Sequence, residues 1–155
     1  MKLIFPALLI AVAVMVLAFT PKPQAASEKA PVVAGGEGLQ FVASNWNTAL
    51  AEAKKQNKLI FLDAYASWCG PCKLLKKNTF PNKVAGQYFN KNFINVAIDM
   101  EKADGPALAQ KYSVNAYPTL IITDADGKMI TYTQGYIDAK QLVDFGKYGV
   151  AQSKK

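Results

Sequence analysis

The sequence predicts one α/β domain, in which a central mixed β-sheet is flanked by helices on both faces. Apolar strand-like runs alternate with helical patterns along the chain, which is typical of parallel crossover units. A tight turn, DADG at 124–127, then joins two runs as an antiparallel hairpin. The chain has 155 residues, of which 51% are hydrophobic, and this is enough for one domain with its own core.

The first predicted elements are a short strand at 39–44 and a helix that follows it. Ser44 or Asn45 can cap this helix, apolar residues recur along it at helical spacing, and Asn57 marks its end. The next run, LIFLDAYA at 59–66, is apolar except for one aspartate. Such a continuous run is typical of a strand buried on both faces.

The remaining elements continue the alternation. CGPC opens a second helix that is predicted to run through residue 80, and a short helix at 82–90 precedes the strand FINVAID at 93–99. A helix is then predicted at 107–114 and a strand at 119–123. A hairpin partner at 128–134 and a closing amphipathic helix at 138–148 follow.

The two ends of the chain are predicted to lie outside the domain. A single lysine precedes an uncharged apolar run, which is typical of an export signal. As a helix the run would span roughly 26 Å, a little short of the ~30 Å hydrocarbon core. Residues 1–19 are therefore either a cleaved signal peptide or a retained membrane anchor, residues 20–38 are a flexible linker, and residues 151–155 are a polar tail. Both alternatives place the domain outside the cytoplasm, for example in a periplasm.

The charge pattern argues against a nucleic-acid partner. The net charge is +7, and every basic residue is lysine. A nucleic-acid binder is expected to use arginine for bidentate contacts to bases and phosphates. We interpret the lysines as a solvated surface with at most weak affinity for anionic partners, and we expect a monomer.

The two cysteines of the chain, Cys69 and Cys72, lie three positions apart in YASWCGPCK. A purely structural disulfide there would close a very short loop and contribute only roughly 2 kcal/mol. Zinc needs four ligands, and the chain has neither a histidine nor a third cysteine. A single cysteine nucleophile would lack a histidine base. Reversible dithiol–disulfide exchange is the chemistry that this spacing favours, and Cu(I) binding through two thiolates stays an alternative.

Dithiol exchange needs one exposed, partly ionised sulfur and a second sulfur one helical turn away. Cys69 is predicted at the start of a helix, where unpaired N–H groups and the helix dipole stabilise a thiolate. Cys72 follows three residues later, close enough to attack a mixed disulfide. Pro71 suits the first turn of a helix, and Gly70 lets the backbone of a partner come close.

Asp63 and Trp68 fit the same site. Asp63 is the one charge in its strand, and burial should raise its pKa, so that it could take the proton from the thiol of Cys72. Alternatively, Asp63 lies at an exposed strand end. Trp68 would form an apolar lip beside the first cysteine, or else it is a partly buried packing residue.

Tyr117-Pro118 is a candidate cis peptide bond, because a proline follows an aromatic residue just before a buried strand. Backbone groups beside it, up to Thr119, would be free to hold a substrate peptide in an extended form. We therefore include all three residues in the candidate site.

These motifs resemble the thioredoxin superfamily. FLDAYASWCGPCK resembles the active-site strand and helix of that family, and YPTLIITDADGK resembles its cis-proline strand and hairpin. The resemblance covers about residues 39–150 and implies a thioredoxin-like fold. The segment 73–93 is longer than in a minimal thioredoxin. It looks more like that of exported or membrane-tethered disulfide reductases, including the C-terminal domain of the transmembrane thiol-disulfide interchange protein.

The resemblance also implies roles for individual residues. Asn95 stands where thioredoxins have a lysine beside the buried aspartate, which is a departure from the family pattern. The resemblance implies that Cys69 is the attacking thiol and that Cys72 is the resolving thiol of the redox disulfide. It also implies that Asp63 is the buried proton carrier, Trp68 the active-site tryptophan and Pro118 the cis-proline.

The Gly-Pro pair between the cysteines predicts a reductant. Oxidising members of the family commonly carry a histidine there, whose charge stabilises the reduced thiolate, whereas Gly-Pro offers only backbone dipoles. A reductant outside the cytoplasm would act on protein disulfides and be recharged by a membrane-embedded thiol donor, with no cofactor. The alternatives are a disulfide oxidase or isomerase of the same fold, a non-enzymatic binding or chaperone module, and a Cu(I) carrier.

Overall fold

The computed structural model describes residues 37–42 and 45–155. The predicted signal peptide or anchor at 1–19 and nearly all of the predicted linker lie outside the described residues. In the part of the chain that the structure describes, no helix is both long and apolar enough to cross a bilayer.

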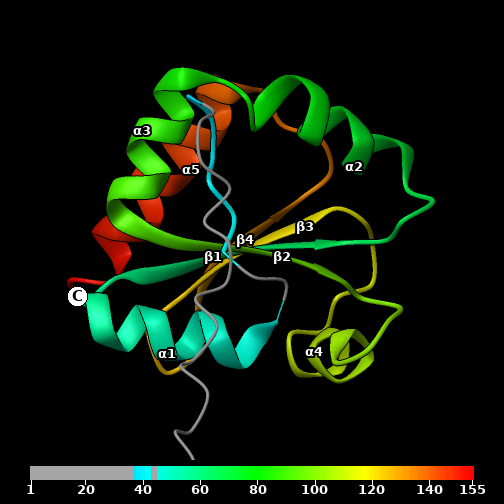
Figure 1. The fold of residues 1–155 in the computed structure, drawn as a ribbon, viewed down its shortest axis with the longest axis horizontal. Coiled ribbons are helices and arrows are strands. Elements are labelled where there is room, and N and C mark those ends of the chain that lie inside the picture. Colours follow the sequence, from blue (N-terminus) through cyan, green and yellow to red (C-terminus); the bar gives the residue numbers. More distant parts are fainter. Residues whose placement is uncertain (1–36, 43–44) are drawn as a thin grey trace, which may run out of the picture.

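A four-stranded mixed sheet forms the centre of the domain (Figure 1). Its spatial order is β2 (Phe93–Asp99), β1 (Leu59–Tyr65), β3 (Thr119–Thr123) and β4 (Met129–Gln134). β1 pairs parallel with β2 and antiparallel with β3, and β4 completes the hairpin with β3. The predicted α/β fold with a mixed sheet is therefore confirmed.

Helices cover both faces of this sheet, as predicted, because alternate side chains of β1 and β2 pack on opposite sides. α1 and α4 pack on one face, and the other helical segments pack on the opposite face (Figure 1). The helical segments are α1 (Trp46–Gln56), α2 (Gly70–Leu74), the π-helical η1 (Leu75–Thr79), α3 (Lys83–Asn92), α4 (Gly105–Lys111) and α5 (Ala139–Gln152).

Local signals set several helix ends where the sequence predicted them, but α4 runs over Gly105–Lys111 and not over the predicted 107–114. The Asn45 side chain caps α1 by accepting a hydrogen bond from the Thr48 backbone N–H at 2.8 Å, and Asn57 ends the helix in the left-handed conformation. α5 continues beyond the predicted end at 148, since its last turn brings Gly149 against the buried side chain of Ile122.

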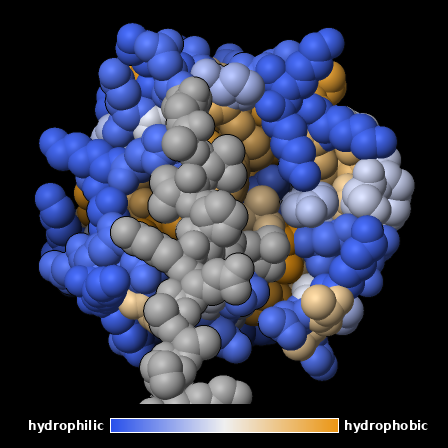
Figure 2. Space-filling view, in the orientation of Figure 1, coloured by the Kyte–Doolittle hydropathy of each residue, from blue (hydrophilic) through white to orange (hydrophobic). Residues whose placement is uncertain are grey.

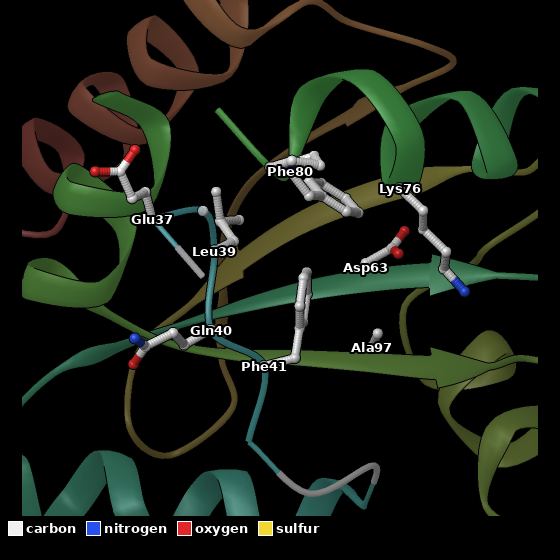
Figure 3. A pocket seen from close by; sticks show the side chains of 10 residues that line it. Glu37, Leu39, Gln40, Phe41, Asp63, Lys76, Phe80 and Ala97 are labelled. Carbon is white, nitrogen blue, oxygen red and sulfur yellow. The ribbon is translucent and has the colours of Figure 1, made fainter. Parts of the chain in front are cut away.

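Residues 37–42, which we call the strap, correct one prediction. A strand was predicted at 39–44, but the described part of this segment forms one parallel bridge only, between Phe41 and Asn95, and residues 43–44 are outside the described residues. The strap crosses the sheet beside β2 (Figures 1 and 3). On this face, hydrophobic side chains gather at the centre and hydrophilic ones surround them (Figure 2).

Side-chain amides hold the strap in place of a strand ladder. Asn90 accepts a hydrogen bond from the Gln40 backbone N–H at 2.8 Å, and its amide donates to the Gly38 carbonyl at 3.0 Å. The Asn95 amide donates to the Gln40 carbonyl at 3.0 Å. Backbone bonds add to these contacts, since the Leu39 N–H donates to the Phe80 carbonyl and the Val42 N–H to the Asn95 carbonyl, each at 2.8 Å. Together these bonds hold the strap without a full strand ladder. The Asn95 side-chain amide is therefore engaged in hydrogen bonding to the strap.

Gly86 on α3 provides a test of this arrangement. A Cβ atom on Gly86 would fall on the carbonyl oxygen of Glu37 and the backbone of Gly38. We expect Gly86→Ala to lower the free energy of unfolding by about 1–3 kcal/mol, because backbone cannot move aside as a side chain can. Gly70→Ala is the control, since nothing lies within 4 Å of a Cβ there. If the two variants had the same midpoint of urea unfolding, the strap would not pack against α3.

Candidate active site

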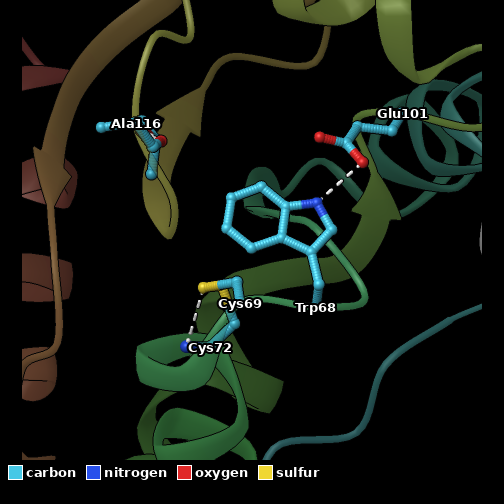
Figure 4. Close-up of a disulfide and its surroundings, with 6 residues drawn as sticks. Trp68, Cys69, Cys72, Glu101 and Ala116 are labelled. Carbon is cyan, nitrogen blue, oxygen red and sulfur yellow. Dashed lines mark hydrogen bonds between the residues drawn. A yellow bond between two sulfur atoms is a disulfide. The ribbon is translucent and has the colours of Figure 1, made fainter.

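Cys69 and Cys72 form a disulfide at the start of α2 (Figure 4), with their Cα atoms 5.4 Å apart. Cys69 is the N-cap residue, and its Sγ accepts a hydrogen bond from the Cys72 backbone N–H at 3.1 Å. This is the helix-start position that the sequence predicted. The same N–H group would stabilise a thiolate on Cys69 once the disulfide is reduced.

The Cys69 side chain is less accessible than predicted. Only 2% of Cys69 is exposed, so the expectation of an exposed sulfur is wrong for the disulfide form. The reason is packing from neighbouring elements: Tyr65 and Tyr117 lie against the cluster formed by Ala66, Cys69 and Cys72. Sequence spacing places a cysteine at a helix start, but it does not show what covers the sulfur.

Trp68, Gly70 and Pro71 form the exposed rim of the disulfide. Trp68 is 65% exposed and is therefore not a core packing residue. Its indole N–H donates to Glu101 Oε2 at 2.9 Å (Figure 4), and its ring meets the Tyr117 ring edge-on, with centroids 5.9 Å apart. Sequence reasoning missed Glu101. Its signal was its place just after β2, because the carboxyl ends of the parallel strands β1 and β2 lie at one edge of the sheet.

The loop before β3 lies beside the disulfide. The Tyr117–Pro118 peptide bond is cis, as predicted, and the Pro118 carbonyl accepts a hydrogen bond from the Gly135 N–H at 2.9 Å. Thr119 is buried, and its hydroxyl donates to the Ala116 carbonyl at 2.7 Å. The Thr119 side chain therefore holds its own loop, whereas the Tyr117 side chain reaches the disulfide cluster.

Asp63 lies fully buried in β1, and neither of its carboxyl oxygens has a hydrogen-bond partner among the described residues. Burial raises the pKa of Asp63 to about 7, and the nearby Lys76 ammonium opposes this rise. The alternative of an exposed strand end is excluded. The predicted rise of the pKa is confirmed, so this carboxyl can gain or lose a proton near neutral pH.

Asp63 and Lys76 line the same cavity of about 670 Å³ (Figure 3). Lys76 follows Cys72 by four residues on the α2–η1 segment, so the cavity is lined from the segment that carries Cys72. Sequence reasoning missed Lys76, although this spacing from Cys72 was visible. The strap and its neighbours supply most of the other lining residues, which are Glu37, Gly38, Leu39, Gln40, Phe41, Phe80, Pro81 and Ala97.

Comparison with known proteins identifies the family. A protein-family model described as "Thioredoxin-like domain" matches residues 46–149 of this chain. The chain belongs to the thioredoxin-like domain family. Relatives of this domain include the thiol:disulfide interchange protein DsbD of Yersinia pestis, which is 34% identical over 94 residues, 59% of this chain and 16% of DsbD. Chloroplastic thioredoxin Y2 of Arabidopsis thaliana is 39% identical over 92 residues, 59% of this chain and 51% of that protein.

Solved structures agree with this assignment. A Bacteroides thetaiotaomicron protein, provisionally named a disulphide-isomerase, matches with 39% identity and a TM-score of 0.66, over 76% of this chain and 97% of that one. The oxidised C-terminal domain of Neisseria meningitidis DsbD has the same fold, with a TM-score of 0.60 and 21% identity, over 66% of this chain and 90% of that one. The chain spans 16% of DsbD and 51% of thioredoxin Y2, and its thioredoxin-like domain carries a CXXC disulfide at Cys69–Cys72.

Proposed function

We propose that this thioredoxin-like domain reduces protein disulfides outside the cytoplasm. The observation that carries the proposal is the Cys69–Cys72 disulfide with only Gly70 and Pro71 between its cysteines. A backbone N–H group contacts the Cys69 sulfur, and no side-chain cation comes from the two intervening positions. A thiolate with modest stabilisation gives up electrons readily, which favours reduction of a partner.

The reaction would run in two exchange steps. The Cys69 thiolate attacks one sulfur of the substrate disulfide, whose S–S bond breaks, and the other substrate sulfur leaves as a thiolate. The Asp63 carboxylate then takes the proton of the Cys72 thiol, and the new thiolate attacks the Cys69 sulfur. The Cys69–Cys72 disulfide forms, and the second substrate sulfur leaves. Two electrons have passed to the substrate, and the proton on Asp63 is released to solvent or to a leaving thiolate.

The rim of the disulfide is suited to an extended substrate. Trp68 and Tyr117 offer aromatic surface beside Cys69. The open space around Gly70 would let a partner backbone approach. The Pro118 and Ala116 carbonyls are already hydrogen-bonded, so the Tyr117 backbone beside Pro118 would bind the peptide as an added strand.

Recharging requires a thiol donor. We propose a membrane-embedded one, since the signal peptide or anchor that the sequence predicts at 1–19 would place the domain outside the cytoplasm. The DsbD relatives, named for thiol:disulfide interchange, support electron transfer between protein partners.

Turnover of a protein disulfide in the presence of dithiothreitol tests this function. We expect sustained reduction of insulin disulfides. In thiol redox buffers, we expect the Cys69–Cys72 pair to have a reduction potential of about −270 mV. A potential at or above about −180 mV would instead indicate an oxidase or isomerase. Absence of turnover would contradict the proposed enzymatic activity and leave two alternatives, a Cu(I) carrier and a binding module. A Cu(I) carrier would retain a stoichiometric amount of Cu(I) after dialysis, whereas a binding module would not.

A further inference from the structure

The Lys76 side chain lines the same cavity as Asp63, and its ammonium forms no ion pair within 4.0 Å among the described residues. It lies 3.6 Å from the centroid of the Tyr65 ring, where a cation is attracted by the face of the ring. Figure 3 shows the Lys76 side chain running from η1 past the Asp63 carboxyl. The aromatic contact holds the charge on Tyr65, two residues after Asp63 in β1, and the Asp63 carboxyl has no hydrogen-bond partner among the described residues.

Other charged groups near Asp63 are already engaged or lie farther along the sheet. Glu37 of the strap lines the same cavity, but its carboxylate pairs with Lys83 at 2.6 Å. Asp99 ends β2 and pairs with Lys102 at 3.3 Å. Lys76 is the one cation among the described residues that line the cavity.

Asn95 cannot supply this charge. It is neutral, and its amide is bonded to the strap carbonyl of Gln40 and to Asn90 Oδ1, each at 3.0 Å. In the thioredoxin pattern a lysine stands at the Asn95 position. This chain therefore has its cation on a different element, the helical segment that also carries Cys72.

We propose that Lys76 is a positioning residue for proton transfer from Cys72 to Asp63, in place of the strand lysine of the thioredoxin pattern. Burial favours the neutral acid, which cannot accept a proton, and the Lys76 charge favours the ionised form. The direction agrees with its effect on the pKa of Asp63, which burial raises and Lys76 lowers. The inference rests on the proposed function, since only a thiol that must be deprotonated needs this base.

The test compares Lys76→Gln with Lys77→Gln, which removes the same charge from the next residue; both lysines are exposed, but only Lys76 lines the cavity. In the disulfide form, carbon NMR of the Asp63 carboxyl is expected to show a titration midpoint above the wild-type value of about 7 in Lys76→Gln only. In turnover assays, the rising limb of the pH–rate profile is expected to move to higher pH. The rate on its acid side should fall about tenfold for each pH unit of that shift.

Two further variants guard against a merely structural effect. Lys76→Arg keeps the charge and is expected to keep the wild-type midpoint and pH profile. In an Asp63→Asn background, Lys76→Gln is expected to cause no further change in the profile. Equal Asp63 midpoints in Lys76→Gln and Lys77→Gln would overturn the proposal, and so would a shifted midpoint with an unmoved pH–rate profile. Failure of the proposed function would look different: the wild-type protein itself would show no turnover, while the titration would still respond.

Discussion

The Cys69→Ser variant is expected to lose disulfide reduction by at least about a thousandfold, because it removes the attacking thiolate. A serine hydroxyl at this position stays protonated near neutral pH and cannot exchange with a disulfide. The hydrogen bond from the Cys72 N–H to the Cys69 sulfur supports the assignment of Cys69 as the ionised thiol. Insulin reduction with dithiothreitol measures the loss against the uncatalysed rate.

The matched variant Cys72→Ser should also stop turnover, but at a different point. Cys69 can still attack, so a mixed disulfide with the substrate should accumulate, because no second thiol resolves it. Mass spectrometry should find this adduct on Cys69, and dithiothreitol should release it. If instead the Cys69→Ser variant accumulated the adduct on Cys72, the two roles would be exchanged.

The second large effect concerns stability. The free energy of unfolding of the disulfide form is expected to fall as the pH rises, and Asp63 should cause most of this change. Its pKa is raised from 3.8 to about 7, so the folded state holds the proton more tightly than the unfolded chain. This contribution is fully present below pH 3.8 and is lost as the pH rises through about 7. A shift of this size corresponds to about 4 kcal/mol for a buried group.

Asp63→Asn should remove this dependence, since an amide does not titrate. The variant is expected to be more stable than the wild type at pH 8 and to differ least near pH 4, as measured by urea unfolding at both pH values. Asp126→Asn is the control, because the Asp126 side chain is 79% exposed and should leave the wild-type pH dependence unchanged. An Asp63→Asn protein with the wild-type slope would show that another group carries the dependence.

The Asp63 carboxyl is buried and has no hydrogen-bond partner among the described residues, so its presence in the core calls for a physical reason. An unpaired buried carboxyl weakens the fold whenever it is ionised. The apolar residues around Asp63 in β1 would allow a neutral side chain there, so stability alone does not favour Asp63. A role in proton transfer from Cys72 would account for it.

Features that depend on neighbouring residues in the chain could be predicted from the sequence. Apolar runs and helical spacing indicated the strands of the mixed sheet, since side-chain periodicity is a local property. Cap residues such as Asn45 and Asn57 act within one helical turn, so the ends of α1 were predicted. The spacing of Cys69 and Cys72 required no more than a helix start to bring both sulfurs together.

Features that depend on contacts between distant segments were decided by the tertiary structure. The strap was predicted as a strand, but amides of α3 and β2 took up its backbone groups. Cys69 was expected to be exposed, and Tyr117, far along the chain, packs beside it. Lys76 lines the cavity of Asp63 because its side chain packs over Tyr65 of β1, a residue from a separate element. The sequence by itself determined most of the elements and the redox pair, because both arise from short spacings. The surroundings that adjust the chemistry of that pair arose only when separate elements packed together.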